Sequence, residues 1–137
     1  MNYGYELLLN FLFFNNMVTE KKQFGNRGEE LARNYLIEHQ YKILASKWQA
    51  SHLEVDIIAE TETYIIFCEV KTRSSNTFMS PQEAVTTQKQ KNIIRAANLY
   101  VLQYKIKKEV RFDIISILLN SNKCTIEHIP DAFSPRW

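Results

Sequence analysis

The chain has 137 residues, of which 45% are hydrophobic and 23% are charged, and its formal net charge is +2. This length suits one domain with a buried core, and only three glycines and three prolines exclude a collagen-like or low-complexity chain. A net charge this small does not by itself identify a nucleic-acid-binding protein.

Residues 1–22 form an N-terminal extension, and we expect the folded domain to span residues 23–137. Within the extension, Tyr5–Phe14 is strongly apolar but too short to cross a membrane. It also lacks the basic start and small-residue cleavage site of a secretory signal. A short helix packed on the domain, a translation start at Met17, and a membrane or partner anchor are three interpretations, of which the first two are favoured. We therefore expect a cytoplasmic protein with no membrane contact.

The domain begins with a helix expected over residues 26–40. Asn26 is a suitable N-cap, and Leu31, Tyr35 and Leu36 supply an apolar stripe at helical spacing. Residues 43–48 predict a first short strand.

Two further runs, residues 52–59 and 64–71, have strand character. Both contain several β-branched or aromatic residues, and the first alternates polar and apolar residues in its first half. The turn between them is short, so an antiparallel hairpin is the natural connection.

The second half of the chain predicts one long helix and two strands. Ser80, Pro81 and Glu83 form a typical helix start, and the helical pattern continues to Tyr104 with a restart at Thr86. Residues 110–119 and 124–129 predict strands. The order of elements indicates an α/β (α+β) fold, with a central sheet flanked by helices.

Acidic and basic side chains gather on one face of the predicted hairpin. Period-two geometry directs Glu54 and Asp56 to one side of their strand, and Glu69 and Lys71 to one side of theirs. Val55 and Ile57 then share the opposite, apolar side. If the turn is centred between residues 62 and 63, residue i faces residue 125 − i, so that Asp56 lies opposite Glu69. A slip of one residue would separate them.

Paired carboxylates repel one another unless a cation joins them. Mg²⁺ (or Mn²⁺) suits Asp56 and Glu69 because it takes oxygen ligands and keeps several waters, and the carbonyl of Val70 is an additional candidate ligand. Lys71 could then orient or deprotonate the attacking water. A solvated hairpin face, on which ion pairs contribute only about 0–1 kcal/mol, is the alternative, and spacing alone favours it.

The wider sequence favours the metal site over the solvated hairpin face. Asp56 followed by Glu69-Val70-Lys71 resembles the D-(x)n-(D/E)-x-K signature of the PD-(D/E)XK nuclease superfamily. Eight blocks occur in the order seen in its YraN-type family: Gly25–Ala32, Glu54–Ala59, Phe67–Arg73, Pro81–Thr86, Lys89–Gln90, Ala96–Ala97, Arg111–Asp113 and His128–Phe133. The chain is therefore similar, over residues 25–133, to small bacterial proteins that resemble Holliday-junction resolvases.

This resemblance implies a restriction-endonuclease-like mixed sheet and a set of site residues. Asp56 and Glu69 would bind the metal, and Lys71 would be the catalytic lysine. Glu30 matches a helix glutamate that helps to hold a metal in related resolvases, although an acid in the first turn of a helix is also favoured by the helix dipole.

Further residues are accessory candidates. Glu54 is an expected accessory acid. Lys89 and Gln90 match a block that either contacts phosphate or supports Lys71, and a solvated helix face is the slightly favoured alternative. For Asp113, which also matches, a capping or supporting role is as well founded as a direct one. Nucleic-acid contacts are expected from Arg73, Lys91 and Arg95.

The sequence departs from the family pattern at Leu53 and Gln40, where the family has glycine. We expect Gln40 to need a left-handed helix cap or a different turn, and Leu53 to alter the shape of the groove.

The resemblance implies a metal-dependent endonuclease acting on DNA, including branched DNA, as a homodimer whose two-fold axis allows symmetric cutting. The alternative is a non-catalytic nucleic-acid-binding or recombination-partner module with the same fold. The sequence does not discriminate DNA from RNA.

Overall fold

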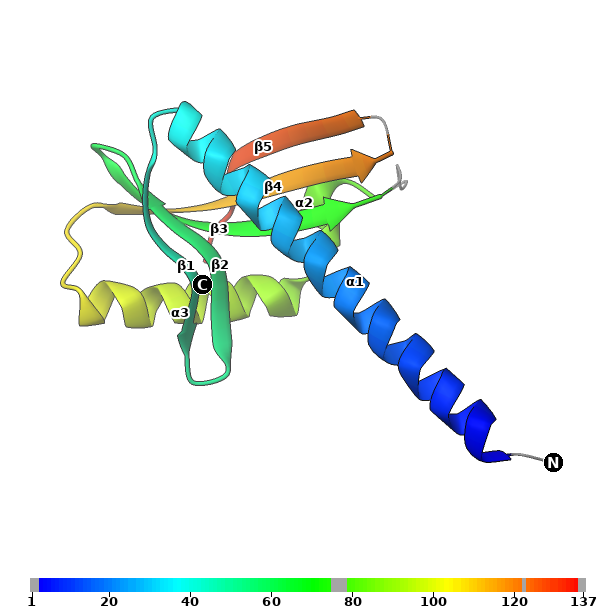
Figure 1. Ribbon diagram of the computed structural model, residues 1–137. Helices are drawn as coiled ribbons and strands as arrows, with labels where there is room; N and C mark the ends of the chain where they lie inside the picture. Colours follow the sequence, from blue (N-terminus) through cyan, green and yellow to red (C-terminus); the bar gives the residue numbers. More distant parts are fainter. Residues whose placement is uncertain (1–2, 75–78, 122, 136–137) are drawn as a thin grey trace.

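The computed structural model describes residues 3–74, 79–121 and 123–135, with side chains from residue 6 onward (Figure 1). In chain order, its elements are α1 (Tyr3–Glu38), β1 (Lys42–Ala50), β2 (Leu53–Glu60), β3 (Tyr64–Arg73), α2 (Pro81–Ala84), α3 (Thr87–Gln103), β4 (Glu109–Asn120) and β5 (Lys123–Phe133). Within these ranges, the strands form one five-stranded sheet in the order β1-β2-β3-β4-β5.

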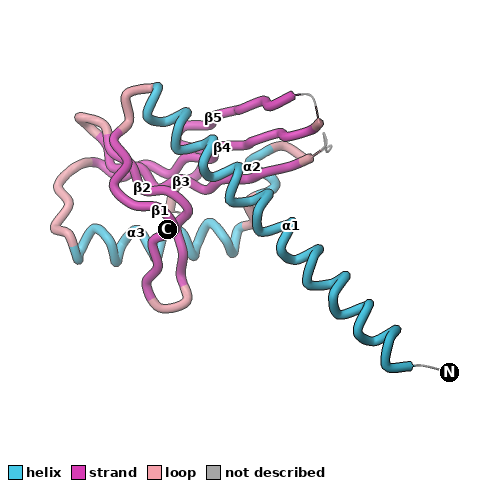
Figure 2. The backbone as a smooth tube through the Cα atoms, viewed as in Figure 1, coloured by secondary structure: helices cyan, strands magenta, loops and turns pink. Residues whose placement is uncertain are grey.

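The sheet is mixed. β3 and β4 run parallel, whereas the other neighbouring strands run antiparallel. Parallel neighbours need a long crossover, and α2 and α3 lie in this connection between β3 and β4 (Figure 2). With helices on both faces, this is the expected α+β, restriction-endonuclease-like architecture.

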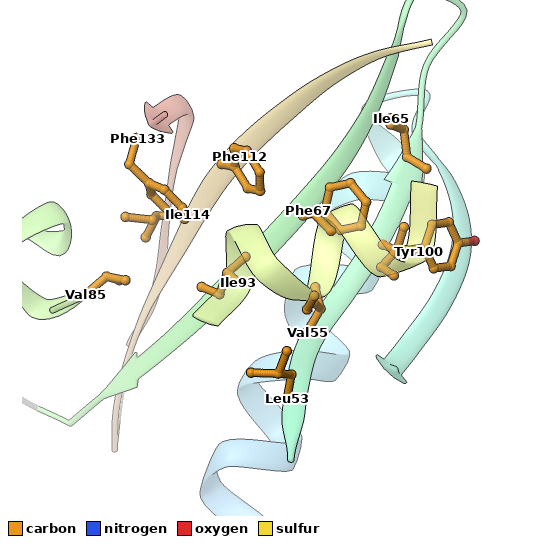
Figure 3. Close-up of a cluster of buried hydrophobic side chains, with 13 residues drawn as sticks. Leu53, Val55, Ile65, Phe67, Val85, Ile93, Tyr100, Phe112, Ile114 and Phe133 are labelled. Carbon is orange, nitrogen blue, oxygen red and sulfur yellow. The ribbon is translucent and has the colours of Figure 1, made fainter. Parts of the chain in front are cut away.

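Apolar side chains are buried on both faces of the sheet. On one face, Phe67 packs with Ile93 and Tyr100 of α3 (Figure 3). On the other face, Ala32 and Leu36 of α1 pack against side chains of the same strands. The sheet is therefore packed between α1 on one face and α3 on the other.

The register of the predicted hairpin is confirmed. Ile57 pairs with Cys68 and Glu60 with Ile65, which is the pairing of residue i with residue 125 − i. The helix starts are also confirmed: Ser80 and Glu83 form a reciprocal capping box on α2, and the Thr86 side chain caps α3.

The first helix was placed wrongly by the sequence pattern. Asn26 is not an N-cap, because α1 continues through it from Tyr3 to Glu38. The segment ahead of Asn26 contains no proline, and Glu20, Lys21 and Lys22 are good helix formers. At the other end, Gln40 has the expected left-handed conformation with φ of 68°, and the Tyr41 N–H donates to the Leu36 carbonyl at 2.9 Å.

The N-terminal half of α1 projects away from the sheet (Figure 1). Its apolar side chains, among them Leu7, Phe11 and Phe14, are exposed. Among the described residues, no helix is both long enough and apolar enough to cross a membrane.

Two glycines of α1 offer a matched test of its packing. A Cβ on Gly28 would overlap the side chain of Thr72 in β3, whereas a Cβ on Gly25 would meet nothing within 4 Å. We expect Gly28→Ala to destabilise the domain by about 1–3 kcal/mol through overpacking. Gly25→Ala should instead stabilise the helix by about 0.5–1 kcal/mol. Urea unfolding of both variants would measure this, and equal effects would contradict the close contact at Gly28.

Candidate active site

The candidate site lies where β2 and β3 separate. Their backbone pairing ends at Ile57 and Cys68. Beyond this pair, the side chain of Asp56, and not a backbone carbonyl of β2, accepts the hydrogen bond from β3. Asp56 Oδ2 accepts a hydrogen bond of 2.8 Å from the Val70 N–H. The side chain of Asp56 is thus held in the gap between the two strands.

The strict alternation that we expected along β2 is broken at this residue. Val55 belongs to the core beneath α3, whereas Ile57 belongs to the core beneath α1. On β1, Lys47 lies between the partners of Val55 and Ile57 and has a φ of 49°. Lys47, which lies opposite Asp56 in this register, therefore also departs from regular strand geometry.

A carboxylate cavity of about 490 Å³ opens at this gap. It is lined by Lys21, Phe24, Gly25, Glu29, Asp56, Glu69, Val70, Thr72, Arg73 and Ser74. Asp56 and Glu69 are only 9% and 4% exposed. The hairpin thus brings together the two carboxylates that the sequence pointed to, next to Val70.

Glu69 lies between basic side chains from two elements. Lys71 Nζ is 3.6 Å from Glu69 Oε1, and Lys89 Nζ of α3 is 3.8 Å from Oε2. Neither distance is a hydrogen bond. Among the described atoms, Glu69 Oε2 and Glu29 Oε2 are both buried without a hydrogen-bond partner.

The acids of the cavity hold their protons more tightly than usual. Burial and repulsion by Asp56 raise the pKa of Glu69 to about 8, against the opposing effect of Lys89 and Lys71. Burial raises the pKa of Asp56, although the hydrogen bond from Val70 opposes the change. Burial and repulsion by Asp56 also raise the pKa of Glu29. The site therefore favours a cation that would relieve this repulsion.

The donor atoms at the site fit a hard divalent cation. Asp56 and Glu69 offer carboxylate oxygens, and one of these oxygens is buried without a hydrogen bond. In the part of the chain that the structure describes, no three His, Cys, Asp or Glu side chains form a complete metal-binding group. Mg²⁺ is commonly held by one or two carboxylates together with water and substrate phosphate, so two carboxylates suffice.

The helix acid at the cavity is Glu29 and not Glu30. Glu29 lines the cavity and lies 3.7 Å from Lys47 Nζ, whereas Glu30 is exposed and does not line it. Helical spacing could have identified it, because Glu29 precedes the buried residues Ala32 and Leu36 by three and seven positions. The family block alone directed attention to its neighbour.

Of the three accessory candidates, Glu54 and Lys89 lie near the two carboxylates, and Gln90 does not. Glu54 accepts a hydrogen bond of 2.9 Å from Gln49 and lies close enough to raise the pKa of Asp56. Lys89 Nζ lies 3.8 Å from Glu69 Oε2, while 38% of the Lys89 side chain remains exposed. Gln90 instead donates to the Val85 carbonyl at 3.1 Å.

The three basic candidates are also separated. Arg73 lines the carboxylate cavity and donates to the Met79 carbonyl and to Ser116. Lys91 and Arg95 line a different cavity on α3, together with Gln90. The structure therefore brings Arg73 to the site, and places Lys91 and Arg95 elsewhere.

Asp113 belongs to a buried network outside the carboxylate cavity. It accepts two hydrogen bonds from Arg111, at 2.8 and 2.9 Å, and one of 3.0 Å from the Asp131 N–H. His128 Nε2 lies 2.7 Å from its second oxygen, Oδ2. Burial opposes ionisation of Asp113, but the hydrogen bonds from His128 and Arg111 outweigh it and lower the pKa. These contacts support a structural role.

The raised pKa of Glu69 predicts how folding stability depends on pH. Between its ordinary value of 4.5 and about 8, the native state keeps a proton that the unfolded chain has lost. Without divalent metal, folding stability should therefore fall across this window as pH rises, by on the order of 1–3 kcal/mol. Urea unfolding in EDTA, at about pH 5 and about pH 8, would measure the slope.

Glu69→Gln should flatten this slope, because glutamine does not titrate. The exposed Glu62, changed in the same way, serves as the control and should leave the slope intact. An unchanged slope in Glu69→Gln would show that Glu69 is not the group responsible.

Comparisons with known proteins identify the family of the chain. Residues 28–117 match the model of the family described as "Uncharacterised protein family UPF0102". The UPF0102 protein of Parabacteroides distasonis is 41% identical over 116 residues, which cover 85% of this chain and 96% of that protein. Those of Bacteroides thetaiotaomicron and Christiangramia forsetii are 41% and 42% identical, and each match covers 98% of the relative and 86% or 85% of this chain. The chain therefore belongs to the UPF0102 family, the YraN-type family that its sequence blocks resemble.

Proposed function

We propose that the protein is a metal-dependent endonuclease that hydrolyses phosphodiester bonds in DNA, including branched DNA. The observation that carries the proposal is the buried pair of Asp56 and Glu69 beside Lys71. Two neighbouring buried carboxylates are costly to ionise without a cation. A lysine beside them can stabilise the negative charge of a phosphate.

Each residue has a role that follows from its position. Asp56 and Glu69 would hold Mg²⁺ or Mn²⁺, with the Val70 carbonyl as a further oxygen donor. When bound, such an ion neutralises charge on the phosphate oxygens and makes water more acidic. Lys71 would orient the attacking water and stabilise negative charge that develops on the phosphate. Lys89 would oppose the rise in the pKa of Glu69, which burial takes to about 8, and so favour the ionised form, because its Nζ lies 3.8 Å from Glu69 Oε2.

The cavity also contains groups suited to the rest of a nucleic-acid strand. Lys21 and Arg73 line it, and such side chains bind phosphates without regard to base sequence. A homodimer is the assembly that would cut two strands symmetrically. Light scattering of the purified chain, with and without junction DNA, would test for it.

Cleavage of labelled nucleic acids tests the proposal directly. The substrates are a four-way junction, duplex DNA, single-stranded DNA and structured RNA, each incubated with Mg²⁺, Mn²⁺ or EDTA. We expect cleavage of DNA that requires the metal and disappears in EDTA. If none of these substrates is cut while the protein remains folded and binds Mn²⁺, the endonuclease proposal fails.

A non-catalytic nucleic-acid-binding or recombination-partner module is the second candidate. It needs only basic side chains such as Lys21 and Arg73 at the cavity, and no bound metal. Calorimetric titration with Mn²⁺ separates the candidates. Binding that is lost in Asp56→Asn supports the enzyme, and no binding supports the module.

A further inference from the structure

A second hollow adjoins the carboxylate cavity beneath α1. This outer cavity has a volume of about 560 Å³, and Phe24 and Ser74 line both cavities. The two hollows are therefore neighbours, and together we call them the groove, with the carboxylates in its inner part. The ring of Phe24, which is partly exposed, lies at the junction.

The outer cavity has two walls of different origin. Gln23, Phe24 and Arg27 lie on one face of α1, as their spacing along the helix requires. Leu119 at the end of β4, followed by Asn120 and Ser121, provides the other wall. A mostly apolar lining with a few polar groups is typical of cavities that bind small organic molecules. Glu20 also lines this cavity, so its lining carries no net positive charge that would by itself attract nucleic acid.

The size of the outer cavity selects the kind of nucleic acid that fits. Its volume of about 560 Å³ lies within the roughly 300–1,000 Å³ of small-molecule cavities, and the hollow is widely open to solvent, so that one nucleotide base could lie in it. A base that is paired and stacked in a duplex cannot enter such a hollow. An unpaired base, or a base turned out of the helix, can enter it.

Resting on the proposed nuclease function, we propose that the outer cavity binds an unpaired base next to the scissile phosphate, and that Phe24 stacks on this base. Leu119 contributes apolar contact from β4, and Asn120 and Ser121 provide polar groups for the base edge. Arg27 lies where it can pair with the neighbouring phosphate. The substrate class is nucleic acid with unpaired nucleotides at the cleavage position, such as a single strand or a branch point.

Gly25 gives an independent way to test the groove. It lines the carboxylate cavity, and a Cβ built on it would meet no atom within 4 Å. A side chain at this position would thus project into the groove and not into the protein. Leucine is also a better helix former than glycine, so Gly25→Leu should obstruct the groove while α1 stays intact.

The experiment measures the binding of fluorescently labelled single-stranded DNA, single-stranded RNA and duplex DNA by anisotropy, in EDTA so that cleavage plays no part. Phe24→Ala should weaken single-strand binding by about 5- to 150-fold, the usual effect of losing one base–aromatic stack. Phe24→Tyr should bind like the wild type. Gly25→Leu should weaken binding while its circular dichroism and thermal unfolding show a folded domain. Phe14→Ala is the matched control, because Phe14 lies on the same helix, is 64% exposed and does not line the groove.

Two results would overturn the proposal. One is single-strand binding by both Phe24→Ala and Gly25→Leu within about twofold of the wild type, when a lost stack costs more. The other is an equal loss of duplex and single-strand binding in Phe24→Ala. The separate cleavage assay with Mg²⁺ distinguishes the two proposals. Selective loss of single-strand binding without cleavage by any protein would support the groove and refute the nuclease. Metal-dependent cleavage, together with single-strand binding that is unchanged in both Phe24→Ala and Gly25→Leu, would do the reverse.

Discussion

Asp56→Asn should reduce metal-dependent cleavage by at least about 10²–10³-fold, which is the scale of losing one well-placed charge in a catalytic site. The asparagine carbonyl can still accept the hydrogen bond that Asp56 takes from the Val70 N–H. The fold should therefore survive while the negative charge disappears. Initial cleavage rates and a Mn²⁺ titration of the same preparation would measure both effects.

The control for this variant is Asp131→Asn. It makes the same chemical change at an exposed side chain, and asparagine tolerates the left-handed backbone found there, with φ of 52°. Cleavage by Asp131→Asn should equal that of the wild type. Undiminished cleavage by Asp56→Asn would show that the reaction takes place elsewhere.

Asp113→Ala should destabilise the domain by about 3–5 kcal/mol, because it leaves the partly buried Arg111 guanidinium without its counter-charge. Asp113 is fully buried, and Arg111 and His128 both approach its carboxylate. Alanine removes the carboxylate, so that Arg111 keeps its hydrogen bond of 2.9 Å to the Tyr41 hydroxyl but cannot give up its charge to compensate. Urea unfolding at neutral pH would measure the loss.

Asp113→Asn should destabilise the domain less, because it keeps one acceptor oxygen. Glu127→Ala, at an exposed position of the neighbouring strand β5, should change stability by no more than about 0.5 kcal/mol. A change below about 1 kcal/mol in Asp113→Ala would contradict the assignment of this network as a structural centre.

Features that depend on nearby residues could be predicted from the sequence. The turn centre between β2 and β3 determined which residues pair, and this register brought Asp56 and Glu69 together. The caps at Ser80 and Thr86 followed from residue chemistry within one helical turn. Both features depend on short-range geometry, for which the sequence pattern is a sufficient guide.

Features that depend on distant contacts could not be predicted. The break in alternation at Asp56 involves Lys47 on another strand, and alternation along a single strand does not reveal it. The arrival of Lys89 at Glu69 depends on how α3 packs on the sheet. The choice of Glu29 over Glu30 depends on which face of α1 is buried, and the misplaced helix start obscured this face.

The position of Lys89 links the charge of Glu69 in the sheet to the packing of α3 on that sheet. Glu69 belongs to the sheet and Lys89 to the helix packed against it, so displacement of α3 would withdraw one cation from the carboxylate. By thermodynamic reciprocity, whatever neutralises Glu69 also changes how firmly α3 is docked. A divalent ion that replaced Lys89 as the counter-charge would loosen this helix from the sheet, and faster amide hydrogen exchange along α3 would report it.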